Sequence, residues 1–415
     1  MKKITVFFAT MVMAGLTACG GSSSSSDSAP APVDIPDENP TANVDCATKE
    51  RTVQWEALLA GNATYLSEYQ LFSNLCNPTT GPNDRGLAYD LSVPLFTDYA
   101  TKYRFVFVPE NTKASYSSGA GTTLEDGRTL YADDGVIDFP VGTVIVKTFS
   151  LPSDTSDRGF DKENMVETRL LIHRETGWKA LPYVWNDAKT DAILDFNGDT
   201  QQTSIMHNSE QLNFTYAVPD PQKCKRCHQI EGKLEPIGPK ARYLNMDYTY
   251  ASGTTKNQLT QWVDSGLLEA TSLPETIEAV PVFKDSTVLA DISEENLEQA
   301  AKGWLDINCA HCHNPAGDAS NTNMHVEYTR SYAADKSGHG VCEDPVSGSG
   351  SGFGFVIVPG DADNSLLTYR LGTNNAGELM PPLGRDLVHA EGHALISRWI
   401  NSLNPSDGTC GQQQP

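Results

Sequence analysis

Short runs that alternate between apolar and polar residues fill the chain from about residue 85 to residue 220. They are rich in β-branched and aromatic side chains, and spacers rich in serine and glycine separate them, which is typical of antiparallel strands. The runs are Arg104–Val108, Val141–Phe149, Met165–His173, Gly177–Trp185 and Asn213–Val218. We therefore predict that residues 46–220 form an antiparallel β-domain of sandwich or barrel type.

Apolar residues recur at helical spacing in two stretches of the last third of the chain. Ser293 can cap a first helix, whose apolar face consists of Leu297, Ala300, Ala301, Trp304 and Leu305. A second helix is predicted from Glu391 to Leu403, and Gly303 would let the two helices cross closely. The part of the chain after residue 220 is therefore expected to be mainly α-helical, which makes the whole an α+β multidomain protein.

The N-terminus has the pattern of an export signal. Two lysines follow Met1, and an uncharged apolar run leads to Cys19, so residues 1–18 read as a signal peptide. Leu16–Cys19 resembles the bacterial lipobox, in which the cysteine is acylated and becomes the new N-terminus. Residues 19–45 then form a lipidated flexible tether, and Gly20 after the cysteine favours the outer membrane, facing the periplasm or the cell surface.

The charge balance narrows the choice of partners. With 30 basic and 53 acidic residues the formal net charge is −23. Nucleic-acid binding needs a positive surface, so this balance argues against a nucleic-acid partner. A basic partner protein remains compatible with it.

Two copies of a C-x-x-C-H motif carry the candidate chemistry. The first copy contains Cys224, Cys227 and His228, and the second contains Cys309, Cys312 and His313. This spacing is typical of covalent c-type haem: each thiol adds to one vinyl group, and the histidine becomes the proximal iron ligand. A zinc site with four cysteines would leave both histidines unexplained. We therefore expect two covalently bound haem groups, one in residues 221–275 and one in residues 290–410.

Four further cysteines are left once Cys19 and the two motifs are set aside. An even remainder in an exported protein suggests two disulfides, for which three pairings are possible. Proximity in the sequence favours Cys46 with Cys76 and Cys342 with Cys410.

Methionines are the candidates for the distal iron ligands. Met380 precedes two prolines that keep its loop extended, and it is the predicted distal ligand of the second haem, with Met324 and His325 as rivals. Met246 is the weaker candidate for the first haem. Its rivals are His207, Met206 and His173, or an open iron.

Several segments resemble a bacterial lipoprotein family of di-haem c-type cytochromes for which no reaction is established. The resemblance covers about residues 50–403, and it is carried by Pro94–Lys102, Phe139–Val144, Glu167–His173, Tyr183–Asp187 and Pro236–Arg242. The segment from Val358 to Trp399 also resembles class I cytochrome c domains. The family implies a β-region followed by two mainly α-helical haem-binding parts.

Electron transfer between periplasmic redox proteins is the function that these patterns favour. A haem enzyme, for example a peroxidase with an acid–base group such as His207 or Glu231 at the first haem, is one alternative. A β-domain that binds a partner, with accessory haems, is another.

The lipid anchor can be tested separately from the haem chemistry. We expect Cys19→Ser to move the protein from the membrane fraction to the soluble fraction, because acyl chains on this residue supply the anchor. The haem absorption spectrum should not change, since the tether separates the anchor from both motifs. Continued sedimentation of the variant with membranes would show that the lipobox assignment is wrong.

Overall fold

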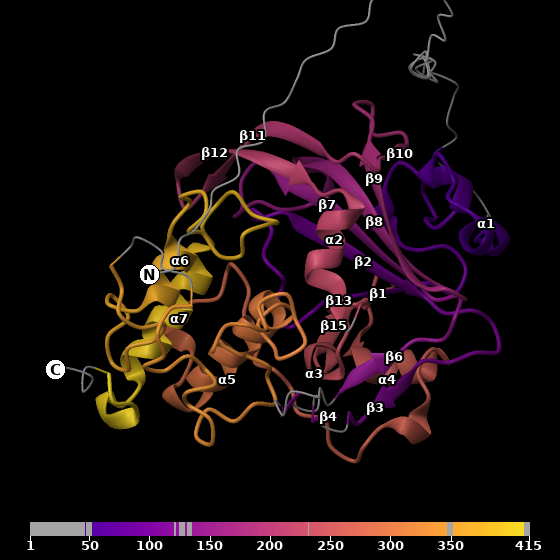
Figure 1. The fold of residues 1–415 in the computed structure, drawn as a ribbon. Coiled ribbons are helices and arrows are strands. Elements are labelled where there is room, and N and C mark those ends of the chain that lie inside the picture. The colour runs from indigo at the N-terminus through magenta and orange to yellow at the C-terminus, as the bar shows by residue number, and fades with distance from the viewer. Residues whose placement is uncertain are drawn as a thin grey trace, which may run out of the picture. The chain divides into compact units, whose positions relative to one another are not determined.

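An antiparallel sheet of six strands is the largest element of the computed structural model (Figure 1). The strand order is β1-β2-β7-β8-β9-β10. The strands are β1 (Leu87–Tyr89), β2 (Thr101–Phe107), β7 (Val144–Pro152), β8 (Glu163–Arg174), β9 (Gly177–Trp185) and β10 (Ala192–Leu194). The four longest of them overlap the four predicted runs between residues 104 and 185, so the alternation of apolar and polar residues identified them correctly.

The structure describes residues 46, 52–119, 122–123, 129–130, 135–230, 232–346 and 352–410. The expected signal peptide and the whole of the expected tether lie outside these residues, as does Glu231. Among the described residues no helix is long and apolar enough to cross a membrane.

The remaining strands form two-stranded ribbons. The longest ribbon joins β11 (Asp199–His207) to β12 (Glu210–Val218), which contains the predicted run Asn213–Val218. The others pair β3 (Ser115–Ser117) with β6 (Val136–Asp138), β4 (Thr122–Thr123) with β5 (Thr129–Leu130), β13 (Gln229–Ile230) with β14 (Lys233–Leu234), and β15 (Asp247–Thr249) with β16 (Thr255–Asn257).

The two faces of the large sheet are covered by different parts of the chain. Residues 53–72, which include α1 (Trp55–Ala60), pack their apolar side chains against one face, where Phe105, Val146 and Tyr183 are buried. On the other face, Val106 and Ile145 belong to the same buried cluster as residues of the later helices. In the described chain this sheet has no second large sheet opposite it, so the predicted sandwich or barrel is wrong.

The prediction of mainly α-helical haem domains is also wrong. The structure is 27% strand and 24% helix, and its helices are short. After α1 they are α2 (Pro221–His228), α3 (Ala241–Leu244), α4 (Gln258–Asp264), α5 (Glu294–Leu305), α6 (Leu366–Gly372) and α7 (Ala390–Ser402). The described residues between 311 and 365 contain no helix, because Pro315, Pro345 and Pro359 and several glycines interrupt it.

The two predicted amphipathic helices are present as α5 and α7. The side-chain oxygen of Ser293 accepts a hydrogen bond from the backbone of Asn296, which confirms the N-cap. The glycine at the helix crossing is Gly392, where an added Cβ would lie 2.5 Å from the ring of Trp304. Gly303, predicted for this role, instead faces Val280, which an added Cβ would approach to 2.2 Å.

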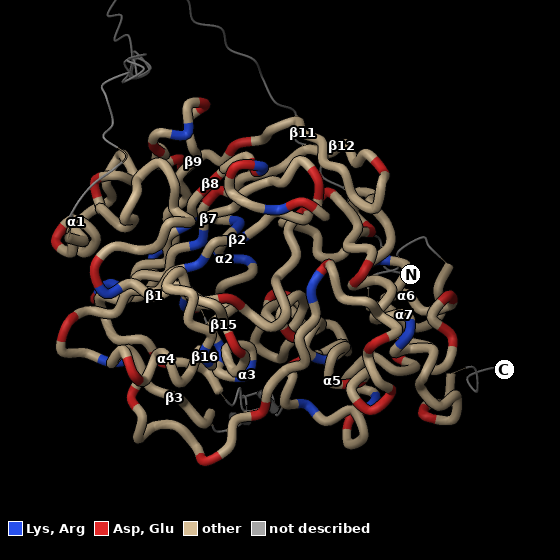
Figure 2. The backbone as a smooth tube through the Cα atoms, turned by 180° about the vertical axis from the view of Figure 1, so that it is seen from behind, with Lys and Arg blue, Asp and Glu red and all other residues tan. Residues whose placement is uncertain are grey.

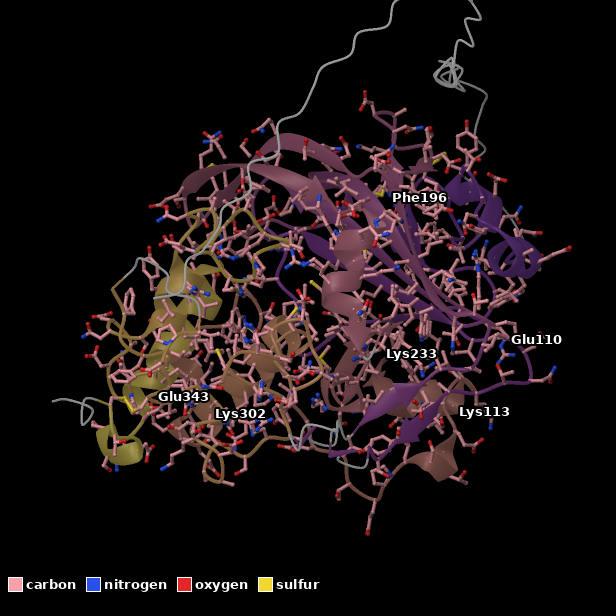
Figure 3. All side chains as sticks on the ribbon, viewed as in Figure 1. Glu110, Lys113, Phe196, Lys233, Lys302 and Glu343 are labelled. Carbon is pink, nitrogen blue, oxygen red and sulfur yellow. A yellow bond between two sulfur atoms is a disulfide. The ribbon has the colours of Figure 1, made fainter. Side chains whose placement is uncertain are left out.

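Two disulfides fasten the ends of the described chain. Cys46 is bonded to Cys76, and Cys342 is bonded to Cys410, close to Glu343 in Figure 3. These are the two pairs that proximity in the sequence favours. They leave the four cysteines of the two motifs as free thiols.

Candidate functional site

The first motif lies on a short helix that begins directly before it. The Asp220 carboxylate accepts hydrogen bonds from the backbone of Gln222 and Lys223, and Pro221 occupies the first helical position. Proline is well tolerated at this position because the first N–H of a helix has no intrahelical partner, so Pro221 starts α2, which carries Cys224, Cys227 and His228.

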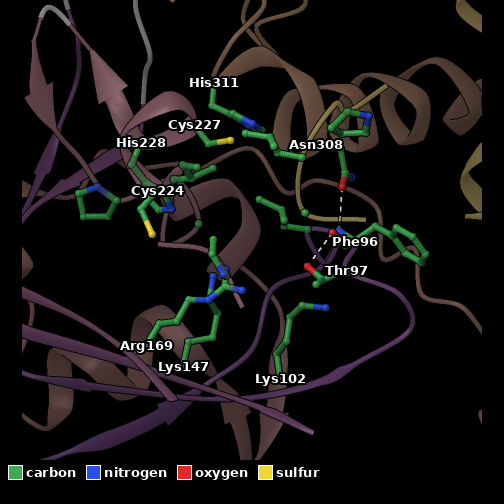
Figure 4. A pocket seen from close by; sticks show the side chains of 18 of the residues that line it. Phe96, Thr97, Lys102, Lys147, Arg169, Cys224, Cys227, His228, Asn308 and His311 are labelled. Carbon is green, nitrogen blue, oxygen red and sulfur yellow. Dashed lines mark hydrogen bonds between the residues drawn. The ribbon is translucent and has the colours of Figure 1, made fainter. Parts of the chain in front are cut away.

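The second motif continues from the end of α5. A wider π-helical turn, Asp306–Ala310, follows the helix and contains Cys309, which is buried. The backbone N–H of His313 donates to the carbonyl of Cys309 at 2.8 Å, which holds the motif in one compact turn. The side-chain oxygen of Asn308 accepts a hydrogen bond of 2.8 Å from the backbone of Phe96 (Figure 4). The segment of residues 94–102 therefore contacts the residue directly before the second motif.

The structure brings the two motifs into contact. Ligand atoms of Cys227, His311 and Cys312 all lie within 4.8 Å of one another. Cys312 Sγ also lies 3.5 Å from the carbonyl oxygen of Arg226. Cys224 and Cys309 are not members of this cluster, so the described residues do not form a four-cysteine zinc site.

Both motif histidines are oriented by backbone carbonyls. His228 Nδ1 lies 2.8 Å from the carbonyl oxygen of Glu235, and His313 Nδ1 lies 3.2 Å from that of Met324. Iron-binding histidines use this arrangement, because it fixes the ring and leaves Nε2 for the metal. Burial lowers the pKa of His228 to about 3 and that of His313 to about 4, so both rings are in the neutral form that a metal requires.

A cavity of about 230 Å³ opens between the first motif and the large sheet (Figure 4). Its lining includes the first motif and His311 of the second, whereas Cys309, Cys312 and His313 are not part of it. Many lining residues are apolar, among them Leu91, Leu95, Ile145, Leu171 and Leu371. A hydrophobic cavity beside two thiols and an oriented imidazole suits a covalently attached haem.

Met380 lines this cavity, and one arginine fixes its loop. Arg385 Nε donates to the carbonyl of Met380 at 3.0 Å, and its Nη2 donates to the carbonyls of Arg370 and Thr373. The backbone N–H of Met380 also donates to the Arg370 carbonyl. Met380, predicted as the distal ligand of the second haem, therefore lies on a tightly held loop at the cavity beside the first motif. His313 of the second motif does not line that cavity.

The other proposed distal ligands lie elsewhere. Met246 does not line the cavity, and its carbonyl accepts a hydrogen bond from Gln258. His207 has both ring nitrogens engaged, with Thr155 at 2.9 Å and with Glu391 at 3.1 Å. His173, Met206, Met324 and His325 are also absent from the lining.

Basic side chains on the sheet were missed by our sequence analysis. Lys102, Arg104, Lys147 and Arg169 all line the cavity. Burial, together with Arg169 and Arg104, lowers the pKa of Lys147 to about 7. The spacing of Lys102 and Arg104, two residues apart on one strand, was a usable signal, because such residues point to the same face.

A buried carboxylate joins the two motif regions. Asp306 Oδ2, three residues before Cys309, lies 2.7 Å from both Arg242 and the hydroxyl of Tyr243, and 3.7 Å from Lys240 Nζ. Its Oδ1 accepts a hydrogen bond of 3.1 Å from the backbone of Tyr328. Burial alone would raise the pKa of Asp306, but Arg242 and Lys240 hold it well below its usual range.

Comparison of the chain with protein-family models, with curated proteins and with solved structures found no match. The function of the site is therefore inferred from the arrangement of its residues and not from a related protein.

We expect Asp306→Asn to lower the free energy of unfolding by about 3–5 kcal/mol at neutral pH, because Arg242 would be left buried without its counter-charge. In the wild type this contribution is complete above about pH 4 and is lost as the pH falls further, since the folded-state pKa is depressed. Urea unfolding at pH 7 and pH 3 measures both effects.

Asp264→Asn is the matched control. It removes the same charge from an exposed pair with Lys256, and it should cost less than about 1 kcal/mol. Equal losses in the two variants would show that Asp306 has no special role.

Proposed function

We propose that the protein is a di-haem c-type cytochrome that transfers single electrons between redox partners. The observation that carries the proposal is the contact between the two C-x-x-C-H motifs, with Cys227 and Cys312 in one cluster. Haems bonded to these neighbouring cysteines would lie close together, and electron transfer requires such closeness. The carbonyl-oriented rings of His228 and His313 support the same interpretation.

The chain's own residues hold and shield the two cofactors. When bound, each haem iron supplies a site that takes up and releases one electron. His228 and His313 would bind the irons through Nε2, and the carbonyls of Glu235 and Met324 keep the rings in place. Met380 lines the cavity beside His228 and would offer a thioether, a ligand type that favours the reduced state. The apolar part of the lining, which includes Leu91, Ile145 and Leu371, would pack against the haem ring.

The proposed setting follows from the sequence. The export signal and Cys19 support a periplasm-facing lipoprotein, because c-type haem is attached outside the cytoplasm. Acidic residues are spread over the outer loops of the described chain in Figure 2. A basic redox protein is therefore the partner that the net charge of −23 favours.

A haem enzyme at the first motif is the second candidate. Met246 lies outside the cavity, and the cavity beside His228 contains room and ionisable groups. His389 lines the cavity, with Nδ1 accepting a hydrogen bond of 3.1 Å from Trp304 and Nε2 3.3 Å from a carboxylate oxygen of Asp285. Such a histidine could serve as an acid–base group if the iron had an open position.

A mass spectrum and a redox-titrated optical spectrum test the proposed function. Protein made with a cytochrome c maturation system should carry the mass of two haems, because each motif supplies two thiols. For a carrier, both irons should be six-coordinate and low spin. A mass without two haems would contradict the cytochrome proposal. Rapid cyanide binding with peroxide turnover of about ten per second or more would instead favour the enzyme.

Met380→Ala should convert one haem from low spin to a mixture with high spin and lower its reduction potential, because the thioether stabilises ferrous iron. Met246→Ala is the comparison, since Met246 is also half-buried but lies outside the cavity. Optical spectra during a redox titration measure both variants. A spectral change in the Met246 variant alone would make Met246 the ligand and exclude Met380.

A further inference from the structure

The cavity has the opposite charge to the rest of the protein. Its lining contains no aspartate or glutamate, although the chain has 53 acidic residues against 30 basic ones. Six basic side chains line it, namely Lys102, Arg104, Lys147, Arg169, Lys223 and Arg385. Four of these come from the central strands of the large sheet. Figure 2 shows the blue segments of β2 and β7 side by side in the interior.

Three of the four form a continuous row across the sheet. Arg104 on β2 is paired in register with Lys147 on β7, and Lys147 is paired with Arg169 on β8. Residues directly opposite one another on adjacent strands point to the same face, and like charges in such positions destabilise a sheet. In Figure 4 the side chains of Lys147 and Arg169 extend from the strands toward Cys224 and His228.

The protein supplies only part of the countercharge. Arg104 pairs with Asp90 at 2.6 Å, and Arg169 pairs with the buried Glu167, whose Oε2 lies 2.7 Å from Nε. Lys102 donates to the carbonyl of Ala100. The Lys147 ammonium makes no hydrogen bond or ion pair with any described residue, and it lies 5.0 Å from the ring centroid of Phe149. Of the four basic side chains, the two arginines have carboxylate partners, whereas Lys102 and Lys147 have none among the described residues.

Uncompensated cations in a low-dielectric cavity are costly unless an anion accompanies them. Arg104 and Arg169 keep further donors, and lysine has three, so the row can bind carboxylate oxygens directly. Its place beside Cys224 and His228 puts these donors next to the first haem attachment site.

We propose that the wall formed by Lys102, Arg104, Lys147 and Arg169 binds carboxylate groups, and that the propionates of the haem at the first motif are the carboxylates it receives. This inference rests on the proposed function, because the haem supplies the anion. The large sheet would then hold the haem through its propionate groups. The positive charge of the wall would also raise the reduction potential of this haem, since nearby positive charge favours the reduced iron. A small anion from solution offers the same chemistry, and the experiment separates the two sources.

Three variants of the holoprotein make up the test. Lys147→Gln removes the ammonium group that has no hydrogen-bond or ion-pair partner, and Lys147→Arg keeps a basic side chain at this position. Lys179→Gln makes the same change at an exposed position on β9, outside the cavity, and serves as the control. The measurements are the haem content by mass spectrometry, the propionate bending bands in resonance Raman spectra, the midpoint potentials, and calorimetric titration with inorganic phosphate and with succinate.

We expect all three variants to retain two haems, and we expect Lys147→Gln to shift the propionate bands and lower one midpoint potential. Lys147→Arg should restore both properties, and Lys179→Gln should behave as wild type. Unchanged bands and potentials in Lys147→Gln would overturn the inference and leave the cytochrome proposal intact. Phosphate or succinate binding that Lys147→Gln weakens tenfold or more, with unchanged bands, would assign the wall to an anion from solution. Protein without two haems would overturn the proposed function itself.

Discussion

The buried carboxylate of Asp306 connects the two parts of the chain that carry the cysteine motifs. It lies on the turn that leads into Cys309, and its partners Arg242 and Tyr243 belong to the segment after the first motif. A charge with 3% of its surface exposed is stable only with such partners, so the two segments can pack in only one arrangement. The contact between Cys227 and Cys312, and with it the cavity beside the sheet, depends on this arrangement.

The features that were predicted correctly are local ones. The strands β2, β7, β8 and β9 were found from a period of two residues, and α5 and α7 from apolar residues three and four apart. The Ser293 cap needs only four consecutive residues. The disulfides were predicted from the sequence too, because four cysteines allow only three pairings and proximity along the chain favours one of them. The six residues of the two C-x-x-C-H motifs were identified from their spacing alone, and their haem chemistry remains a prediction.

The features that were missed depend on contacts between distant segments. No pattern in the sequence shows that residues 53–72, rather than a second sheet, cover one face of the large sheet. Helical spacing in α5 and α7 suggested a helical second half, but the segment between them is held by the Cys342–Cys410 disulfide and by irregular turns. Met246 occupied a plausible place in the sequence, yet the chain folds so that it lies away from the cavity.

The protein surface is acidic, whereas the cavity is lined by basic side chains. This difference favours a carboxylate that belongs to a covalently attached cofactor over a free anion that diffuses in from solution. The net charge of −23 repels free anions, and this repulsion extends over about 8 Å at physiological ionic strength. A propionate of a haem bonded to Cys224 and Cys227 would reach the wall regardless of that field, because the covalent bonds would hold it there. The same acidic surface would attract the proposed basic redox partner. One charge pattern would therefore serve both ends of the proposed electron path, with the exterior selecting the partner and the basic side chains of β2, β7 and β8 holding the cofactor.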